Sequence, residues 1–208
     1  MVRDKKGIYK NFLFLSLLLI LFLFLSLGFL NSIDLIISEN ISNLWNTLLN
    51  FFFIIVSQYI FDTKVLCVFA VLFFLFNFKK DRIKSFIFLF IVGLTAFISE
   101  GAKYLFSKPR PMDALILESS YSFPSSHSSI SFVLFILIYF YFEDKIKNKK
   151  LFLFFNIFLI LLIGFSRIYL NVHYLSDVFG GYLLGAIILI FLKKVKYKGF
   201  DSILGKLY

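Results

Sequence analysis

Residues 151–192, LFLFFNIFLILLIGFSRIYLNVHYLSDVFGGYLLGAIILIFL, contain two apolar blocks and a short polar stretch between them. The blocks cover about 151–170 and 177–192, and the polar stretch runs from Asn171 to Asp177. A helix needs about 20 residues to cross the hydrocarbon core of a bilayer. Each block is therefore expected to form a membrane-spanning helix, the shorter one tilted or extended by a turn of its flanks.

Four more apolar blocks lie upstream, near 12–30, 61–78, 85–106 and 127–142, and charged or polar stretches separate them. The chain is 60% hydrophobic and 21% aromatic, which leaves too little polar surface for a soluble domain of 208 residues. The sequence therefore predicts an all-α fold: an integral-membrane bundle of six transmembrane helices, with one domain covering residues 1–208.

The first apolar block follows four basic residues, which raises the alternative of a secretory signal peptide. Ser26, Leu27 and Gly28 offer only a weak cleavage site. The block is also longer than the apolar region of a signal peptide, which has about 7–15 residues. We therefore favour a membrane anchor that is retained.

The segment 44–60 is apolar enough to span the membrane, but Asn46, Asn50, Ser57 and Gln58 interrupt it. Basic clusters at the N-terminus, at 79–84, at 145–150 and from Lys193 onward hold 17 of the 22 Lys and Arg residues. All four clusters fall on one side of the membrane only if 44–60 does not cross it, and basic loops mark the cytoplasmic side. We expect an interfacial or re-entrant helix near 44–60 and both termini in the cytoplasm.

The formal net charge of +10 does not indicate nucleic-acid binding, because the basic residues form short clusters and no broad basic face. The single cysteine, Cys67, can form no intramolecular disulfide. The expected partners are the membrane and an anionic lipid, with no nucleic acid, and the sequence does not determine the oligomeric state.

Three polar stretches on the predicted outer side contain residues that are unusual at a membrane boundary. They are Lys103 with Arg110-Pro111, then Pro124 to His127, then Ser166-Arg167 with His173 and Asp177. An unpaired charge is costly at this depth, so the three cations indicate an anionic partner. Phosphate suits the two arginines, because a guanidinium binds two phosphate oxygens at once.

The two histidines of the chain both lie in these stretches. His127 is expected in the first turn of a helix, where free N–H groups and the positive dipole end favour an anion. His173 and Asp177 are four residues apart, so on a helix they would share a face, and the carboxylate would fix the imidazole tautomer. We expect His173 to be the nucleophile, Asp177 its partner and His127 the general acid.

The order of these motifs resembles the type 2 phosphatidic acid phosphatase (PAP2) family, whose members are related to the vanadium haloperoxidases. The motif core covers 103–177, about a third of the chain. The resemblance implies metal-independent phosphoester hydrolysis through a phosphohistidine. It assigns phosphate binding to Lys103, Arg110, Ser125, Ser126 and Arg167, and catalysis to His173, His127 and Asp177. The family usually has Gly where this chain has Ser126; because the backbone N–H remains, we expect the activity to be tuned and not lost.

The expected function is therefore that of a lipid phosphatase in the cell (inner or plasma) membrane, a multi-pass protein whose active site faces the periplasm or cell exterior. Undecaprenyl diphosphate and phosphatidylglycerophosphate are the favoured substrates, ahead of phosphatidate and a lipid A phosphate. The alternatives are a lipid phosphotransferase that uses the same histidine and a non-catalytic, phosphate-recognising transporter. No cofactor and no metal ion are expected.

Several neighbours of the motifs are assigned structural roles. Lys108 matches no motif position and is expected to be a membrane anchor. Glu100 is expected to form an ion pair with Lys103, and Gly181 and Gly185 to allow close helix packing.

Overall fold

The computed structural model describes residues 5–194, with side chains over 13–192, and the regular structure of this part is entirely helical. The elements are α1 (Lys5–Ser26), α2 (Asn31–Asn40), η1 (Ile41–Leu44), α3 (Thr47–Ile54), the π-helical turn η2 (Ile55–Ile60), α4 (Thr63–Asn77), α5 (Arg82–Phe106), α6 (Ser126–Phe142), η3 (Glu143–Lys145), α7 (Lys149–Tyr169) and α8 (Leu175–Lys194). The prediction of an all-α fold is confirmed.

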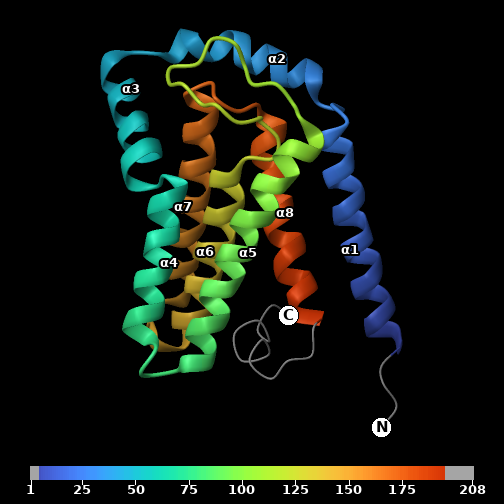
Figure 1. The fold of residues 1–208 in the computed structure, drawn as a ribbon, viewed down its shortest axis with the longest axis vertical. Helices are drawn as coiled ribbons and strands as arrows, with labels where there is room; N and C mark the ends of the chain where they lie inside the picture. Colours follow the sequence, from blue (N-terminus) through green and yellow to red (C-terminus); the bar gives the residue numbers. More distant parts are fainter. Residues whose placement is uncertain (1–4, 195–208) are drawn as a thin grey trace.

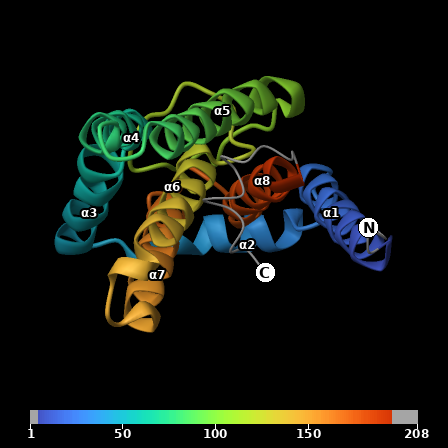
Figure 2. The ribbon, with the colours of Figure 1, turned by 90° about the horizontal axis from the view of Figure 1, so that it is seen from below.

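The long helices α4 to α8 run alternately along one axis and form a bundle, as Figure 1 shows. Helix α6 lies at its centre and packs against α4, α5, α7 and α8 (Figure 2). Helix α1 stands at the edge and packs mainly against α8. The central position of α6 places its N-terminal residues, which include His127, inside the bundle.

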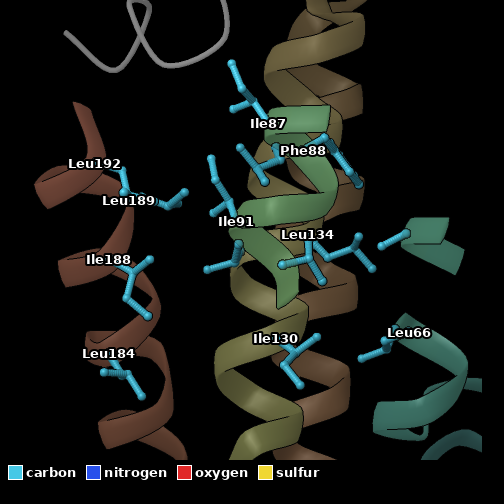
Figure 3. Packing of buried hydrophobic residues seen from close by; sticks show 14 of the residues in the cluster. Leu66, Ile87, Phe88, Ile91, Ile130, Leu134, Leu184, Ile188, Leu189 and Leu192 are labelled. Carbon is cyan, nitrogen blue, oxygen red and sulfur yellow. The ribbon is translucent and has the colours of Figure 1, made fainter. Parts of the chain in front are cut away.

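The core between these helices is formed by apolar side chains of α5, α6 and α8. Phe88, Ile91, Leu134 and Leu189 are at most 2% exposed and lie together in Figure 3. Many large apolar side chains on the outside of the bundle are exposed, for example Phe76 and Phe97, each at 78%. This pattern suits a protein whose outer solvent is lipid, because lipid tails do not drive apolar side chains inward.

Four helices are each long and apolar enough to cross a membrane: α5, α6 with η3, α7 and α8. Two bent pairs also pass this test as pairs, 13–44 with a bend of 58° and 47–77 with a bend of 46°. The structure therefore holds four to six candidate spans. The helix ends differ from the predicted ones by a few residues, because polar caps such as Asp81 and Asn148 allow α5 and α7 to begin before the apolar blocks.

The interfacial or re-entrant helix that we expect near 44–60 is part of a segment, 31–60, that consists of several helical pieces. Helix α2 and η1 lie across one end of the bundle, beyond the end of α1 (Figure 1). Helix α3 then turns along the bundle and joins α4 through η2 and a sharp bend at 61–62. The π turn buries Ser57 completely, and this residue reaches the site described below.

The turns that connect α4 to α5 and α6 to α7 lie at the end of the bundle where α1 begins and α8 ends (Figure 1). These turns contain the basic clusters at 79–84 and 145–150. The loop 107–125, the turn 171–174 and α2 lie at the opposite end. The chain termini, which we expect in the cytoplasm, lie outside the described residues.

Candidate active site

Three cationic side chains from different segments converge at the end of the bundle that α2 covers. Lys103 lies in the last turn of α5, Arg167 in the last turn of α7, and Arg110 in the loop after α5. The Oγ atom of Ser120 accepts hydrogen bonds from Lys103 at 3.2 Å and from Arg110 at 3.1 Å. This shared acceptor places the first two cations side by side.

The guanidinium of Arg110 is held by backbone carbonyls on both sides. Its Nε donates to the Ser120 carbonyl at 2.6 Å, and its Nη1 donates to the Val172 carbonyl at 2.7 Å. Pro109 and Pro111 fix their own φ angles and restrict the backbone around Arg110. The fork of this side chain is therefore preorganised beside the turn that contains His173.

Arg167 is fully buried, and two segments far away in the sequence accept hydrogen bonds from its terminal nitrogens. Its Nη1 donates to Oγ of Ser57 and its Nη2 to the carboxylate of Glu118. The Nε atom has no hydrogen-bond partner among the described residues. A buried guanidinium with an unused N–H is suited to bind a further acceptor, such as a phosphate oxygen.

His173 lies in the turn between α7 and α8 and is 2% exposed. Nη1 of Arg110 is 3.3 Å from Nε2 of His173. A guanidinium can only donate, so Nε2 accepts and the imidazole proton resides on Nδ1. Burial and then the charges of Arg110, Arg167 and Lys103 hold the pKa of His173 well below its ordinary value. The ring is thus neutral, and the electron pair of Nε2 accepts from Arg110.

Nδ1 of His173 faces Asp177 at 3.6 Å. The two residues do not share a helical face, because α8 begins only at Leu175; this part of the sequence prediction is wrong. Asp177 lies in the first turn of α8, and its Oδ2 accepts from the backbone N–H of Tyr174 at 2.8 Å. The contact arises because a carboxylate in the first turn reaches back to cap the helix, and this brings it beside the preceding turn.

His127 occupies the first turn of α6 and is 6% exposed. It lies within electrostatic range of Arg167, His173, Lys103 and Arg110. Its Nε2 is 3.9 Å from Oδ2 of Asp62 and has no hydrogen-bond partner among the described residues. His127 thus lies at the same end of the bundle as His173 and the three cations.

The N-terminus of α6 points into this site. Ser125 is the N-cap, and its Oγ accepts from the N–H of Ser128 at 3.4 Å. Helix α8 approaches this turn closely because Gly181 has no side chain; a Cβ there would lie 2.5 Å from the Ser125 carbonyl oxygen. The expected role of Gly181 in close packing is confirmed.

Glu118 is a further member of the site, and no motif in the sequence points to it. Besides its ion pair with Arg167, it interacts electrostatically with Arg110 and Lys103. Burial acts to raise the pKa of its carboxyl, but the three cations outweigh this effect and the pKa is lowered. An ionised carboxylate thus lies among the three cations.

The family model described as PAP2 superfamily matches residues 84–201, which is more than half of the chain. The chain belongs to the PAP2 superfamily. It is 34% identical over 119 residues to phosphatidylglycerophosphatase B of Bacillus subtilis (strain 168), a match that covers 55% of this chain and 56% of that relative. It also resembles the crystal structure of a transmembrane PAP2 type phosphatidylglycerolphosphate phosphatase from Bacillus subtilis, with a TM-score of 0.78 and 26% identity over 88% of this chain and 98% of the other.

The PAP2 motif residues that the sequence singled out are brought together at one end of the bundle. They are Lys103, Arg110, Ser125, Ser126, His127, Arg167, His173 and Asp177. Among the described residues, no group of three or more His, Cys, Asp or Glu side chains could hold a metal ion. The predicted resemblance to the family is confirmed.

Ser126, which replaces the Gly usual in PAP2 proteins, is accommodated without backbone strain. It is the first residue of α6, and the positive-φ residues of the described chain do not include it. Its Oγ donates to Glu100 at 2.7 Å and accepts from Ser99 at 3.0 Å. Glu100 also forms the expected ion pair with Lys103, at 2.9 Å.

The role expected for Lys108 in this PAP2 chain is wrong. Its side chain is 14% exposed, and its ammonium group forms ion pairs with Asp34 of α2 and Asp177 of α8. Lys108 is therefore part of the support of the site and not an anchor in the lipid head groups. No local signal in the sequence reveals this contact, because Asp34 is 74 residues away.

Proposed function

We propose that the chain is a membrane phosphatase that removes the phosphate of a lipid phosphate through a phosphohistidine on His173. The observation that carries the proposal is the approach of Arg110 to Nε2 of a buried, neutral His173, in a site that also holds Lys103, Arg167 and His127. Cations around a nucleophile stabilise the charge that builds on phosphoryl oxygens in the transition state.

In the proposed first step, Nε2 of His173 attacks phosphorus and the bond from phosphorus to the lipid oxygen breaks. The proton on Nδ1 faces Asp177, which stabilises the positive charge that forms on the ring. His127, which enters this step as an imidazolium once the anionic phosphate lies beside it, gives its proton to the departing lipid oxygen. In the second step, water loses a proton to His127 and attacks the phosphohistidine, which releases inorganic phosphate and restores both histidines. Neither step uses a cofactor or a metal ion.

Glu118 occupies the place that we assign to the phosphate. Its carboxylate pairs with Arg167 in the absence of substrate, and a phosphate that enters would compete for the same donors. Ser125 and Ser126 would bind the phosphate through the N-terminus of α6. The free Nε of Arg167 offers an additional donor.

We further propose phosphatidylglycerophosphate as the preferred substrate, because the curated relative and the solved structure are both named for this activity. Undecaprenyl diphosphate is the competing substrate, since its terminal phosphate would meet the same cations. The purified chain, assayed in EDTA against both lipids and phosphatidate, is expected to release phosphate fastest from phosphatidylglycerophosphate. An absolute requirement for added Mg²⁺ would contradict the mechanism.

The phosphohistidine can be tested directly with ³²P-labelled substrates. With a ³²P-labelled aryl phosphate, whose leaving group needs no general acid, the His127→Ala variant is expected to accumulate label that is stable in base and labile in acid, because only the second step then depends on His127. The His173→Ala variant is expected to take up no label. Release of inorganic phosphate supports a hydrolase, whereas transfer of the label to an added alcohol as the main product would support the phosphotransferase.

We place the site on the outer face of the cell membrane, on the basis of the basic clusters at the opposite end of the bundle. The test is labelling of single cysteines in intact cells with a membrane-impermeant maleimide, after replacement of Cys67 by Ala. Met112→Cys, in an exposed loop of the site end, is expected to react, and Lys147→Cys, exposed at the other end, is expected to be protected. The reverse pattern would refute this orientation.

A further inference from the structure

The ammonium group of Lys108 joins three segments that are distant in the sequence. Its Nζ donates to Oδ1 of Asp177 at 3.0 Å, to Oδ2 of Asp34 at 3.1 Å and to Oγ of Ser176 at 2.7 Å. The ammonium also lies 4.6 Å from the centre of the Tyr174 ring. All three donors of this side chain are therefore used, and it has no hydrogen left for a ligand.

The two carboxylates that Lys108 contacts are among the most buried acids of the described chain. Asp34 is 2% exposed, and Asp177 is 0% exposed. Two carboxylates at this depth repel each other, and a buried charge without a partner is strongly destabilising. Lys108 is the cation that makes this arrangement possible.

The two oxygens of Asp177 have different partners. Oδ1 accepts from Lys108, and Oδ2 accepts from the N–H of Tyr174 and faces Nδ1 of His173. Rotation of the carboxylate about its last bond would break both contacts at once. The lysine on one side thus fixes the orientation of the carboxylate plane toward the imidazole on the other.

Asp34 completes the arrangement from the helix that crosses the end of the bundle. Besides Lys108, it accepts from the backbone N–H of Ser176 at 2.9 Å and from the hydroxyl of the same residue. Helix α2 is thereby attached to the first turn of α8, the turn that contains Asp177. The position of α2 and the position of the carboxylate depend on the same lysine.

We propose that Lys108 is a positioning residue of the site: it orients Asp177 toward His173, and Asp34 of α2 holds Lys108 in place. Only the kinetic test of this inference rests on the proposed phosphatase function. The state of the His173 ring can be measured whether or not the protein turns over a lipid.

The first test is nitrogen NMR of the protein labelled with ¹⁵N-histidine, in which two histidines give signals and His127→Gln assigns them. In the unaltered protein we expect His173 as one neutral tautomer with its proton on Nδ1. In Lys108→Met we expect the same tautomer, because Arg110 still donates to Nε2, but a shifted Nδ1 signal, because the carboxylate of Asp177 is no longer held toward the proton on Nδ1. In Lys108→Arg we expect the original signal. An unchanged His173 signal in Lys108→Met would overturn the proposal.

The second test is kinetic and uses a double-mutant cycle of Lys108→Met with Asp177→Asn. Lys108→Met is expected to lower kcat about 10- to 100-fold with less than a threefold change in KM, as found when an outer partner of a working group is removed. In a protein that already carries Asp177→Asn, Lys108→Met is expected to lower kcat by less than about threefold, because the lysine acts through this carboxylate. If the factors by which the two single substitutions lower kcat multiply in the double variant, the proposal is overturned.

The matched control is Lys84→Met, which breaks a half-exposed lysine–aspartate pair at the other end of the bundle and is expected to leave kcat unchanged. If Lys108→Met does not fold, Asp34→Asn with Lys108→Met removes one charge of each sign and preserves the net charge. This double variant is expected to fold and to show the shifted His173 Nδ1 signal. A double variant with wild-type kcat and His173 signal would show that Lys108 only attaches α2.

Discussion

Nη1 of Arg110 lies 3.3 Å from Nε2 of His173, although the two residues are 63 positions apart. The guanidinium therefore sits at the nitrogen that we propose as the nucleophile, and not only at the phosphate that this nitrogen would attack. As phosphorus approaches Nε2, the guanidinium can exchange its contact with the ring for contacts with phosphoryl oxygens. This geometry explains why the planar fork of arginine is needed here in addition to its charge.

Arg110→Lys is expected to lower kcat/KM by roughly 10²–10³-fold, the cost of losing a donor aimed at transition-state charge. A lysine retains the charge but cannot bond to the Ser120 and Val172 carbonyls and to a phosphate together. The measurement is steady-state phosphate release. Arg82→Lys, which changes the same residue type at the far end of α5, serves as the control. A lysine variant with near-native activity would show that charge alone suffices.

Glu118→Gln is expected to strengthen the binding of phosphate, because it removes the carboxylate that competes for Arg167. The same change leaves a fully buried guanidinium without its counter-ion, so the unliganded protein should lose stability, by up to about 3–5 kcal/mol. Thermal unfolding with increasing inorganic phosphate checks both effects. Without phosphate, the variant should have a lower Tm than the unaltered protein, and each increase in phosphate concentration should raise its Tm by more. A smaller rise than in the unaltered protein would contradict the expected stronger binding of phosphate.

The stability of the protein is expected to fall as the pH is lowered below the ordinary histidine pKa of 6.5. The pKa of His173 is depressed in the folded state by burial and by Arg110, Arg167 and Lys103, so at these pH values the unfolded chain binds a proton that the folded chain does not. Each unit of pH in this window costs about 1.4 kcal/mol for this group. His173→Gln should flatten the dependence of Tm on pH between 6.5 and 5; an equal slope in both proteins would argue against a neutral, buried His173.

Gly181→Ala is expected to lower stability by about 1–3 kcal/mol and to reduce activity, since the added methyl group would meet backbone and Cβ atoms of the first turn of α6. The nearest of these is the Ser125 carbonyl oxygen, at 2.5 Å. Gly101→Ala is a matched control on α5, because a Cβ there has no neighbour within 4 Å. Equal Tm values for the two variants would show that α6 and α8 can separate without cost.

The spanning helices and the candidate site of this protein can largely be predicted from its sequence, because a membrane restricts where long apolar segments and charged residues occur. Blocks of about 20 apolar residues predict spanning helices, and the motifs of Lys103, Arg110, Arg167, His127 and His173 predict one anionic site. The structure agrees on the helices α5 to α8 and on the convergence of these residues. Both conclusions depend on composition and on short-range spacing, which a linear sequence contains.

The tertiary structure alone decided the rest. It placed α2 across the end of the bundle, put Ser57 and Glu118 on Arg167, and joined Lys108 to Asp34 and Asp177. It also set His173 in a turn before α8 and not on a shared helical face with Asp177. A buried charge is neutralised by whichever opposite charge the fold brings within reach, and the partner's place in the chain leaves no local pattern to read.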